Sequence, residues 1–264
     1  MSRRIRERPP RLLLVLGVIG ALVFLLPLIG LLSQTPWADL ATLISSDAVL
    51  DALRISLITS LIAALISVVL GVPLAWLLAR VDFPGVNAVR AIVTLPMVLP
   101  PVVGGAALLF ALGRRGLVGG PFNDATGLLL PFSIWGVVLA NVFVAMPFLV
   151  VTVEGALRNV DRDYEQAAAT LGASPMQVFR RVTLPFIAPS LRAGIVLAWA
   201  RSLGEFGATI TFAGNLQGRT QTLPLAVFVA LESDRDAAVA ISLVLVVISL
   251  VVLLSMRDRW WGRT

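Results

Sequence analysis

The sequence predicts an all-α membrane protein with six transmembrane helices. Its 264 residues are 58% hydrophobic and only 14% charged, and their mean hydropathy is +0.94, whereas about 25% of a soluble domain is charged. Six apolar runs reach the length of about 20 residues that a helix needs to cross a bilayer. In chain order, the expected spans are Leu12–Leu32, Leu53–Leu78, Ala91–Leu112, Leu128–Val153, Leu191–Phe212 and Ala237–Leu254.

The first span follows a basic segment, MSRRIRERPPR, which is also typical of a secretory signal peptide. The apolar run after it is too long for the core of a signal peptide, and no cleavage site of small residues follows. We therefore expect residues 12–32 to be retained as a transmembrane helix.

The second and third spans contain helix breakers. Gly71 and Pro73 lie in the second, and the segment TLPMVLPPVVGG, residues 94–105, lies in the third. Proline in a membrane helix frees a backbone carbonyl, which is tolerated where neighbouring helices or water satisfy it. These residues fit either a flexible, pathway-lining helix or an ordinary kink that helps packing.

The arginines orient the spans. With the N-terminus inside, 15 of the 21 arginines fall in cytoplasmic segments, five fall outside, and Arg201 falls within the fifth span. Cytoplasmic loops carry the excess of positive charge, so we expect both termini in the cytoplasm and a multi-pass protein of a prokaryotic cytoplasmic membrane. The longest segment between spans, Glu154–Ser190, is then cytoplasmic, and no extramembrane domain is expected.

The residue types exclude several kinds of function. Cysteine and histidine are absent, and all 21 basic residues are arginines. Disulfides, histidine-based metal sites and Ser-His or Cys-His catalysis are therefore excluded, as is a Walker A site with its lysine. The arginines flank apolar runs, so the net charge of +6 indicates membrane orientation rather than nucleic-acid binding. We therefore expect that the chain is not an enzyme and that it binds neither a cofactor nor a metal ion.

The cytoplasmic segment 158–189 is expected to form two short helices joined by a turn. Asp161 and Asp163 are plausible N-caps of the first helix, and Gly172 follows it where a C-cap glycine is expected. In the second, Ser174 is an N-cap candidate and Pro175 takes the favoured first position. This second helix is expected to end before Pro185.

This segment resembles the EAA loop of ABC-importer permeases. Gly172 takes the place of the family's glycine, and Gln166 stands where the family has its acidic residue, which is displaced to Glu165. The resemblance implies a helix that couples the permease to a cytoplasmic ATPase. The residues expected to take part are Glu165, Gln166, Ala167, Ala168, Gly172, Ala173, Ser174, Pro175, Phe179, Leu184 and Pro185.

Two further segments resemble molybdate and tungstate permeases of the type I ABC importer family. They are AWARSLGEFGATITFAGN, 198–215, and GRTQTLPLAVFVALES, 218–233, and the similarity runs over about residues 50–254. Sulfate permeases share a related R-x-x-G-E-[FY]-G arrangement. The resemblance implies a permease domain over 51–254, preceded by segment 1–50 with the first span and followed by a cytoplasmic tail, 255–264.

Arg201 and Glu205 are four residues apart near the middle of the fifth expected span. Charges at that depth are costly and should face the bundle and pair. Either a salt bridge that fixes packing or a pair lining the path of an oxyanion would explain them. The candidates for the translocation pathway are Arg201, Ser202, Gly204, Glu205, Thr209 and Asn141.

The resemblance implies a homodimer that moves molybdate or tungstate by alternating access. Its implied partners are two cytoplasmic ABC ATPase subunits, which use the ATP, and an extracytoplasmic oxyanion-binding protein. A sulfate or thiosulfate permease is the alternative. A secondary transporter would usually show repeated halves, and none is evident. A membrane-embedded enzyme would have Glu205 as its only deep carboxylate.

Overall fold

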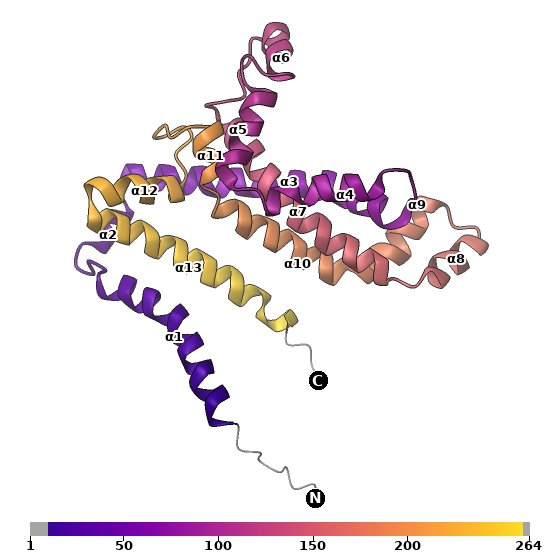
Figure 1. Cartoon of the computed structure of the whole chain (residues 1–264), viewed down its shortest axis with the longest axis horizontal. Coiled ribbons are helices and arrows are strands. Elements are labelled where there is room, and N and C mark those ends of the chain that lie inside the picture. The colour runs from indigo at the N-terminus through magenta and orange to yellow at the C-terminus, as the bar shows by residue number, and fades with distance from the viewer. Residues whose placement is uncertain (1–9, 261–264) are drawn as a thin grey trace, which may run out of the picture.

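A computed structural model describes residues 10–260 and shows helices without a strand in that part of the chain (Figure 1). The basic segment 1–9 and the end of the tail, 261–264, lie outside the described residues. Five helical runs are long and apolar enough to span a membrane, or six if one bent pair counts as a span. The five are α1 (Arg11–Ser33), α3 (Asp47–Arg80), α7 (Ile134–Asn159), the run Pro175–Leu203 and α13 (Arg235–Trp260).

The helical fold class is therefore confirmed, and most expected spans lie where the apolar runs placed them. The first, second and sixth fall inside α1, α3 and α13. The fourth is shifted, because α7 begins only at Ile134. Its start is fixed by Ser133, whose hydroxyl accepts a hydrogen bond from the N–H of Gly136 at 3.1 Å.

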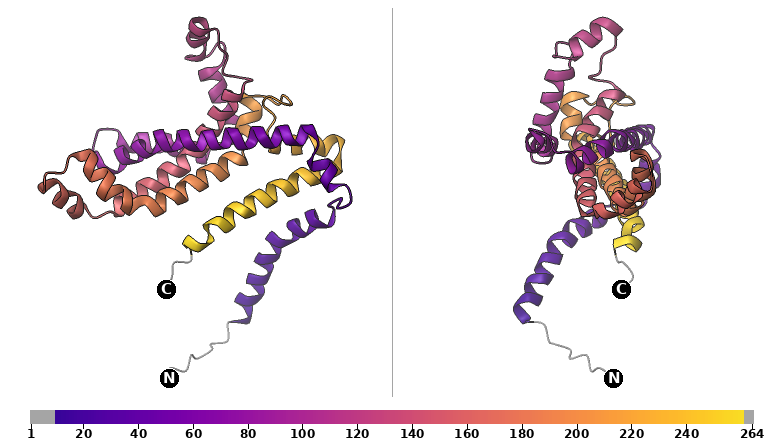
Figure 2. Two further views of the ribbon diagram at one scale, coloured as in Figure 1. Left: turned by 180° about the vertical axis from the view of Figure 1, so that it is seen from behind. Right: turned by 90° about the vertical axis from the view of Figure 1, so that its right-hand side faces the viewer.

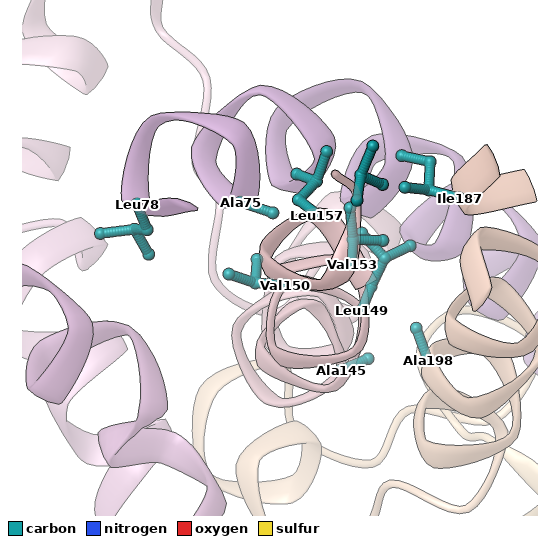
Figure 3. Close-up of a cluster of buried hydrophobic side chains, with 10 residues drawn as sticks. Ala75, Leu78, Ala145, Leu149, Val150, Val153, Leu157, Ile187 and Ala198 are labelled. Atoms are coloured by element: carbon teal, nitrogen blue, oxygen red, sulfur yellow. The ribbon is translucent and has the colours of Figure 1, made fainter. Parts of the chain in front are cut away.

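The centre of the bundle consists of α3, α7 and α10 (Leu184–Leu203), which pack against one another. Figure 3 shows Ala75 and Leu78 from α3, Leu149 from α7 and Ile187 from α10 in one buried apolar cluster. Close approach depends on small residues, as is usual between membrane helices. A Cβ atom added at Gly71 of α3 would lie only 3.0 Å from the side chain of Leu149.

A second group of helices lies at one end of the bundle. There α2 (Leu40–Ile44) packs on α13, and α12 (Leu223–Ser233) packs on α13 and α3. Val49 of α3, Leu223 of α12 and Ile241 of α13 share their apolar core. By contrast, α1 stands away from the bundle, and none of its residues is buried (Figures 1 and 2).

The prediction of one helix over Ala91–Leu112 was wrong. The segment forms α4 (Val86–Thr94), a short 3₁₀ turn, η1 (Leu95–Met97), and α5 (Pro101–Leu112), and the chain bends by 117° between Val86–Met97 and α5. Prolines 96, 100 and 101 cause the break, because proline lacks a backbone N–H and disfavours α-helical geometry in the preceding residue. With α6 (Gly119–Thr126), α5 projects away from the bundle (Figures 1 and 2).

The limits of the fifth span, Leu191–Phe212, were also wrong. The helix begins as α9 (Pro175–Val178), passes through a π turn, η2 (Phe179–Thr183), and continues as α10 to Leu203. It does not end before Pro185, because this residue lies in the first turn of α10, where a missing N–H is tolerated. After Gly204 the chain starts a separate short helix, α11 (Gly207–Phe212).

Candidate functional site

Segment 158–189 forms the expected helix–turn–helix. Its first helix is α8 (Arg162–Thr170), and the Asp161 side chain accepts a hydrogen bond from the N–H of Asp163 at 3.0 Å. The turn that follows α8 requires glycine, because Gly172 has a φ of +86° and side chains clash in that region. The N–H groups of Gly172 and Ala173 close the helix by donating to the carbonyls of Ala169 and Ala168.

The second helix of this loop also begins with a specific cap. The Ser174 hydroxyl accepts from the N–H of Gln177, and the Gln177 side chain accepts from the N–H of Ser174 at 2.8 Å. These reciprocal bonds form a capping box, with Pro175 in the first turn. Serine and proline at these positions therefore fix where the chain turns back towards the bundle.

The tip of the loop is apolar and exposed. Leu171 is 89% exposed and Met176 is 64% exposed, although they flank a turn held by backbone hydrogen bonds. Of the small residues singled out from the sequence, Ala167 is exposed and Ala168 is half-buried. Large apolar side chains grouped on a surface are typical of a contact with another molecule.

Glu165 is tied to two other segments of the chain. Its Oε1 atom accepts from Nη2 of Arg80 at 3.0 Å and from the hydroxyl of Thr183 at 2.7 Å. Gln166, at the position where the family has its acid, is exposed. Arg80 and Thr183 were not singled out from the sequence, because Arg80 lies 85 positions before Glu165 and no local pattern connects them.

The second candidate site lies where α10 ends. Nη1 of Arg201 is 2.7 Å from Oε2 of Glu205, and the side chains are 30% and 1% exposed. The expected pair exists, but not within one helix, because Glu205 follows the end of α10 at Leu203. Its Oε1 atom instead accepts from the N–H of Ala208 at 2.9 Å, so this carboxylate also fixes the start of α11.

Three of the remaining pathway candidates, Ser202, Gly204 and Thr209, lie next to this turn in the chain, whereas Asn141 lies on α7. Ser202 and Thr209 are buried, and Gly204 is the exposed residue that closes α10. Asn141 of α7 donates to the hydroxyl of Thr59 at 3.4 Å. Within residues 10–260, the Asn141 carbonyl oxygen and the Ser202 and Thr209 hydroxyls have no hydrogen-bond partner. Buried polar atoms usually have one, so these three give the interior some spare hydrogen-bonding capacity.

In the part of the chain that the structure describes, no three acidic side chains cluster so that they could hold a metal ion. The arrangement therefore combines a loop with an exposed apolar tip, an arginine–carboxylate pair whose carboxylate is buried, and buried polar oxygens without a hydrogen-bond partner among the described residues. These features suit the binding and movement of a solute.

The chain matches a known family and several known proteins. Residues 71–258 match the model of the binding-protein-dependent transport system inner membrane component. The chain is 46% identical over 250 residues to the molybdenum transport system permease protein ModB of Mycobacterium tuberculosis, covering 95% of this chain and 94% of the relative. It is 37% identical over 238 residues to the sulfate transport system permease protein CysT of Salmonella typhimurium, covering 89% and 86%.

The fold also matches that of a solved membrane transporter. A chain from a bacterial ABC transporter involved in the import of the acidic polysaccharide alginate superposes with a TM-score of 0.75. The match covers 96% of both chains at 20% sequence identity. At that identity the likeness describes the fold alone.

Proposed function

The chain belongs to the family of binding-protein-dependent transport system inner membrane components, and from this premise we propose that it moves molybdate, or tungstate, into the cell. It is a multi-pass protein of the cytoplasmic membrane. The observation that carries the choice of cargo is the 46% identity to a relative named as a molybdenum permease, over 95% of this chain. The relative named as a sulfate permease is less similar, at 37%.

The proposed permease domain is 51–254, with both termini in the cytoplasm. The arginine distribution favours this orientation. The arrangement of helices supports a common side for the two ends, since α1 starts and α13 ends on the side away from α2 and α12 (Figures 1 and 2). The loop around Gly172 then projects into the cytoplasm, where an ATPase could reach it.

The loop is proposed to receive the work of ATP hydrolysis from a separate ATPase subunit. Two features support this role. The tip of the loop, Leu171 and Met176, is exposed, and hydrogen-bonded caps fix the end of its first helix and the start of its second. The assembly would contain a second copy of the chain, two ATPase subunits and an extracytoplasmic binding protein that delivers the oxyanion. Alternating access then follows when movement of the loop rearranges the spans.

The Arg201–Glu205 pair is proposed to lie along the translocation path. A dianion such as molybdate is attracted to arginine, and Glu205 neutralises part of that charge at 2.7 Å. Partial neutralisation of the arginine suits an importer, because an arginine without a carboxylate partner would bind the anionic cargo too tightly to release it. Arg201 is the more accessible partner, with 30% of its side chain exposed against 1% for Glu205, so it is the residue that a passing anion could approach.

A competition experiment tests the cargo. The permease, its ATPase and its binding protein are reconstituted in vesicles, and uptake of labelled molybdate is measured with an excess of unlabelled molybdate, tungstate or sulfate. We expect molybdate and tungstate to compete and sulfate to leave uptake unchanged. Equal competition by sulfate would favour the alternative, a sulfate permease, which the 37% identity to the CysT protein supports.

A further inference from the structure

Glu165 joins the loop to two different parts of the bundle. It lies on α8, while its partners lie in the last turn of α3, Arg80, and in the π turn before α10, Thr183. One carboxylate oxygen accepts both hydrogen bonds. A single atom therefore holds together three segments that are far apart in the sequence.

The aromatic packing of α8 leads to α10, since the ring of Tyr164 on α8 stacks on that of Phe186 on α10 with centroids 5.3 Å apart. A cavity of about 730 Å³ lies between the loop and α3, lined by Val72, Pro73 and Trp76 of α3 and by Met176 and Phe179 of the loop. The helix α8 packs against α9 and η2 within its own loop. The bond between Glu165 and Arg80 therefore connects α8 to α3 directly, whereas the packing of α8 leads to α3 through η2 and α10.

The ion pair is placed to transmit force. The Arg80 side chain is 8% exposed and that of Glu165 is 20% exposed, so water screens their attraction less than it does at a surface. Arg80 contributes only Nη2 to the pair, and its buried Nε has no partner among the described residues. A small shift of the carboxylate towards Nε would give two-pronged pairing, which is the stronger geometry for arginine and a carboxylate.

We infer that the Arg80–Glu165 pair, with Thr183, is the mechanical link through which the coupling loop moves α3. This inference rests on the proposed function of the loop. Glu165 and Arg80 act as positioning residues and need touch neither the cargo nor the ATPase. The displaced acid of the EAA-like segment thus has its partners, Arg80 and Thr183, within this chain.

A second buried carboxylate provides a matched control. Oε1 of Glu154, on α7, accepts from Nε of Arg90 at 2.8 Å and from Nη2 of Arg158 at 2.7 Å. Arg90 also donates to the carbonyl of Leu78 at 3.1 Å. This network joins the ends of α3, α4 and α7 but has no bond to the loop, so Glu154→Gln removes an equivalent charge without touching the link.

The test measures whether α8 and α3 move together. The natural chain has no cysteine, so spin labels can be attached specifically at Thr170→Cys on α8 and Leu65→Cys on α3, both exposed positions. In the complex with its ATPase, we expect the distance between the labels to stay constant when ATP is added. In Glu165→Gln, ATP should produce a second, shifted distance, because the loop moves without α3.

The controls separate this link from general damage and from the choice of cargo. Glu154→Gln should behave like the parent protein, and the charge exchange Arg80→Glu with Glu165→Arg should restore the single distance. Uptake per ATP hydrolysed should fall about fivefold or more in Glu165→Gln, the lower range of a typical coupling between sites. An ATP response of the distance that is identical in Glu165→Gln and in the parent overturns the inference. The distance needs no cargo, so failure of molybdate uptake in the parent would count against the proposed function alone.

Discussion

The loop around Gly172 and the turn around Glu205 both reverse or redirect the chain between helices, but they face different surroundings. At the loop, Leu171 and Met176 are 89% and 64% exposed. At the turn, the Glu205 side chain is 1% exposed and bonds both Arg201 and the N–H of Ala208. Substitutions at the turn should therefore damage the fold and transport together, whereas substitutions at the loop should damage transport alone.

The largest effect is expected at the turn. Arg201→Ala leaves Glu205 buried without its partner, and breaking a buried pair in this way costs about 3–5 kcal/mol. We expect lower yield, a lower unfolding temperature and loss of molybdate uptake. Arg114→Ala, at an exposed arginine, is the control and should change neither. Equal, mild effects of the two substitutions would show that the buried pair is unimportant.

An intermediate effect is expected at Gly172. Leucine in the left-handed region that Gly172 occupies, with a φ of +86°, costs about 1–2 kcal/mol, so Gly172→Leu should shift the loop while the bundle remains folded. Uptake should fall strongly while the ATPase still hydrolyses ATP.

The matched substitution for Gly172→Leu is Gly155→Leu. Gly155 lies in α7 with no atom near the position of an added Cβ, and its φ is not positive. It should transport normally. Normal uptake by Gly172→Leu itself would remove the loop from the coupling mechanism.

The smallest effect on stability is expected at the loop tip. Leu171→Ser changes an exposed side chain, so the free energy of unfolding should change by less than about 0.5 kcal/mol, while the ATPase should bind more weakly. Leu117→Ser is the control, because Leu117 is similarly exposed, at 85%, but lies between α5 and α6. Copurification of the ATPase with each variant measures the difference, and equal recovery would show that the tip does not contact it.

Turns and helix caps were predicted best from the sequence, because they depend on a few neighbouring residues. Gly172, Ser174 and Pro175 take the turn and cap positions expected of them, because such preferences act within one helical turn. The sequence indicated a helix breaker in the third span but not how sharply the chain bends after Met97. Prolines predict a break, but they do not predict a bend of 117°. The early end of α10 was missed as well, because Gly204, Glu205 and Gly207 lie in a largely apolar run without a proline.

Contacts between distant segments could not be predicted from one sequence. The pairing of Arg80 with Glu165 spans 85 positions, and that of Arg90 with Glu154 spans 64. Both arginines had been interpreted only as positive charges at the cytoplasmic ends of spans. Their partners depend on how α3, α4, α7 and α8 come together, which helical periodicity does not specify.

The energy source of uptake distinguishes an ABC permease from a secondary transporter. Vesicles containing the permease, its ATPase and the loaded binding protein are supplied either with ATP or with a proton gradient, and accumulation of labelled molybdate is measured. We expect accumulation with ATP and none with the gradient alone. Accumulation that persists with the proton gradient and without the ATPase would contradict this expectation and indicate a secondary transporter.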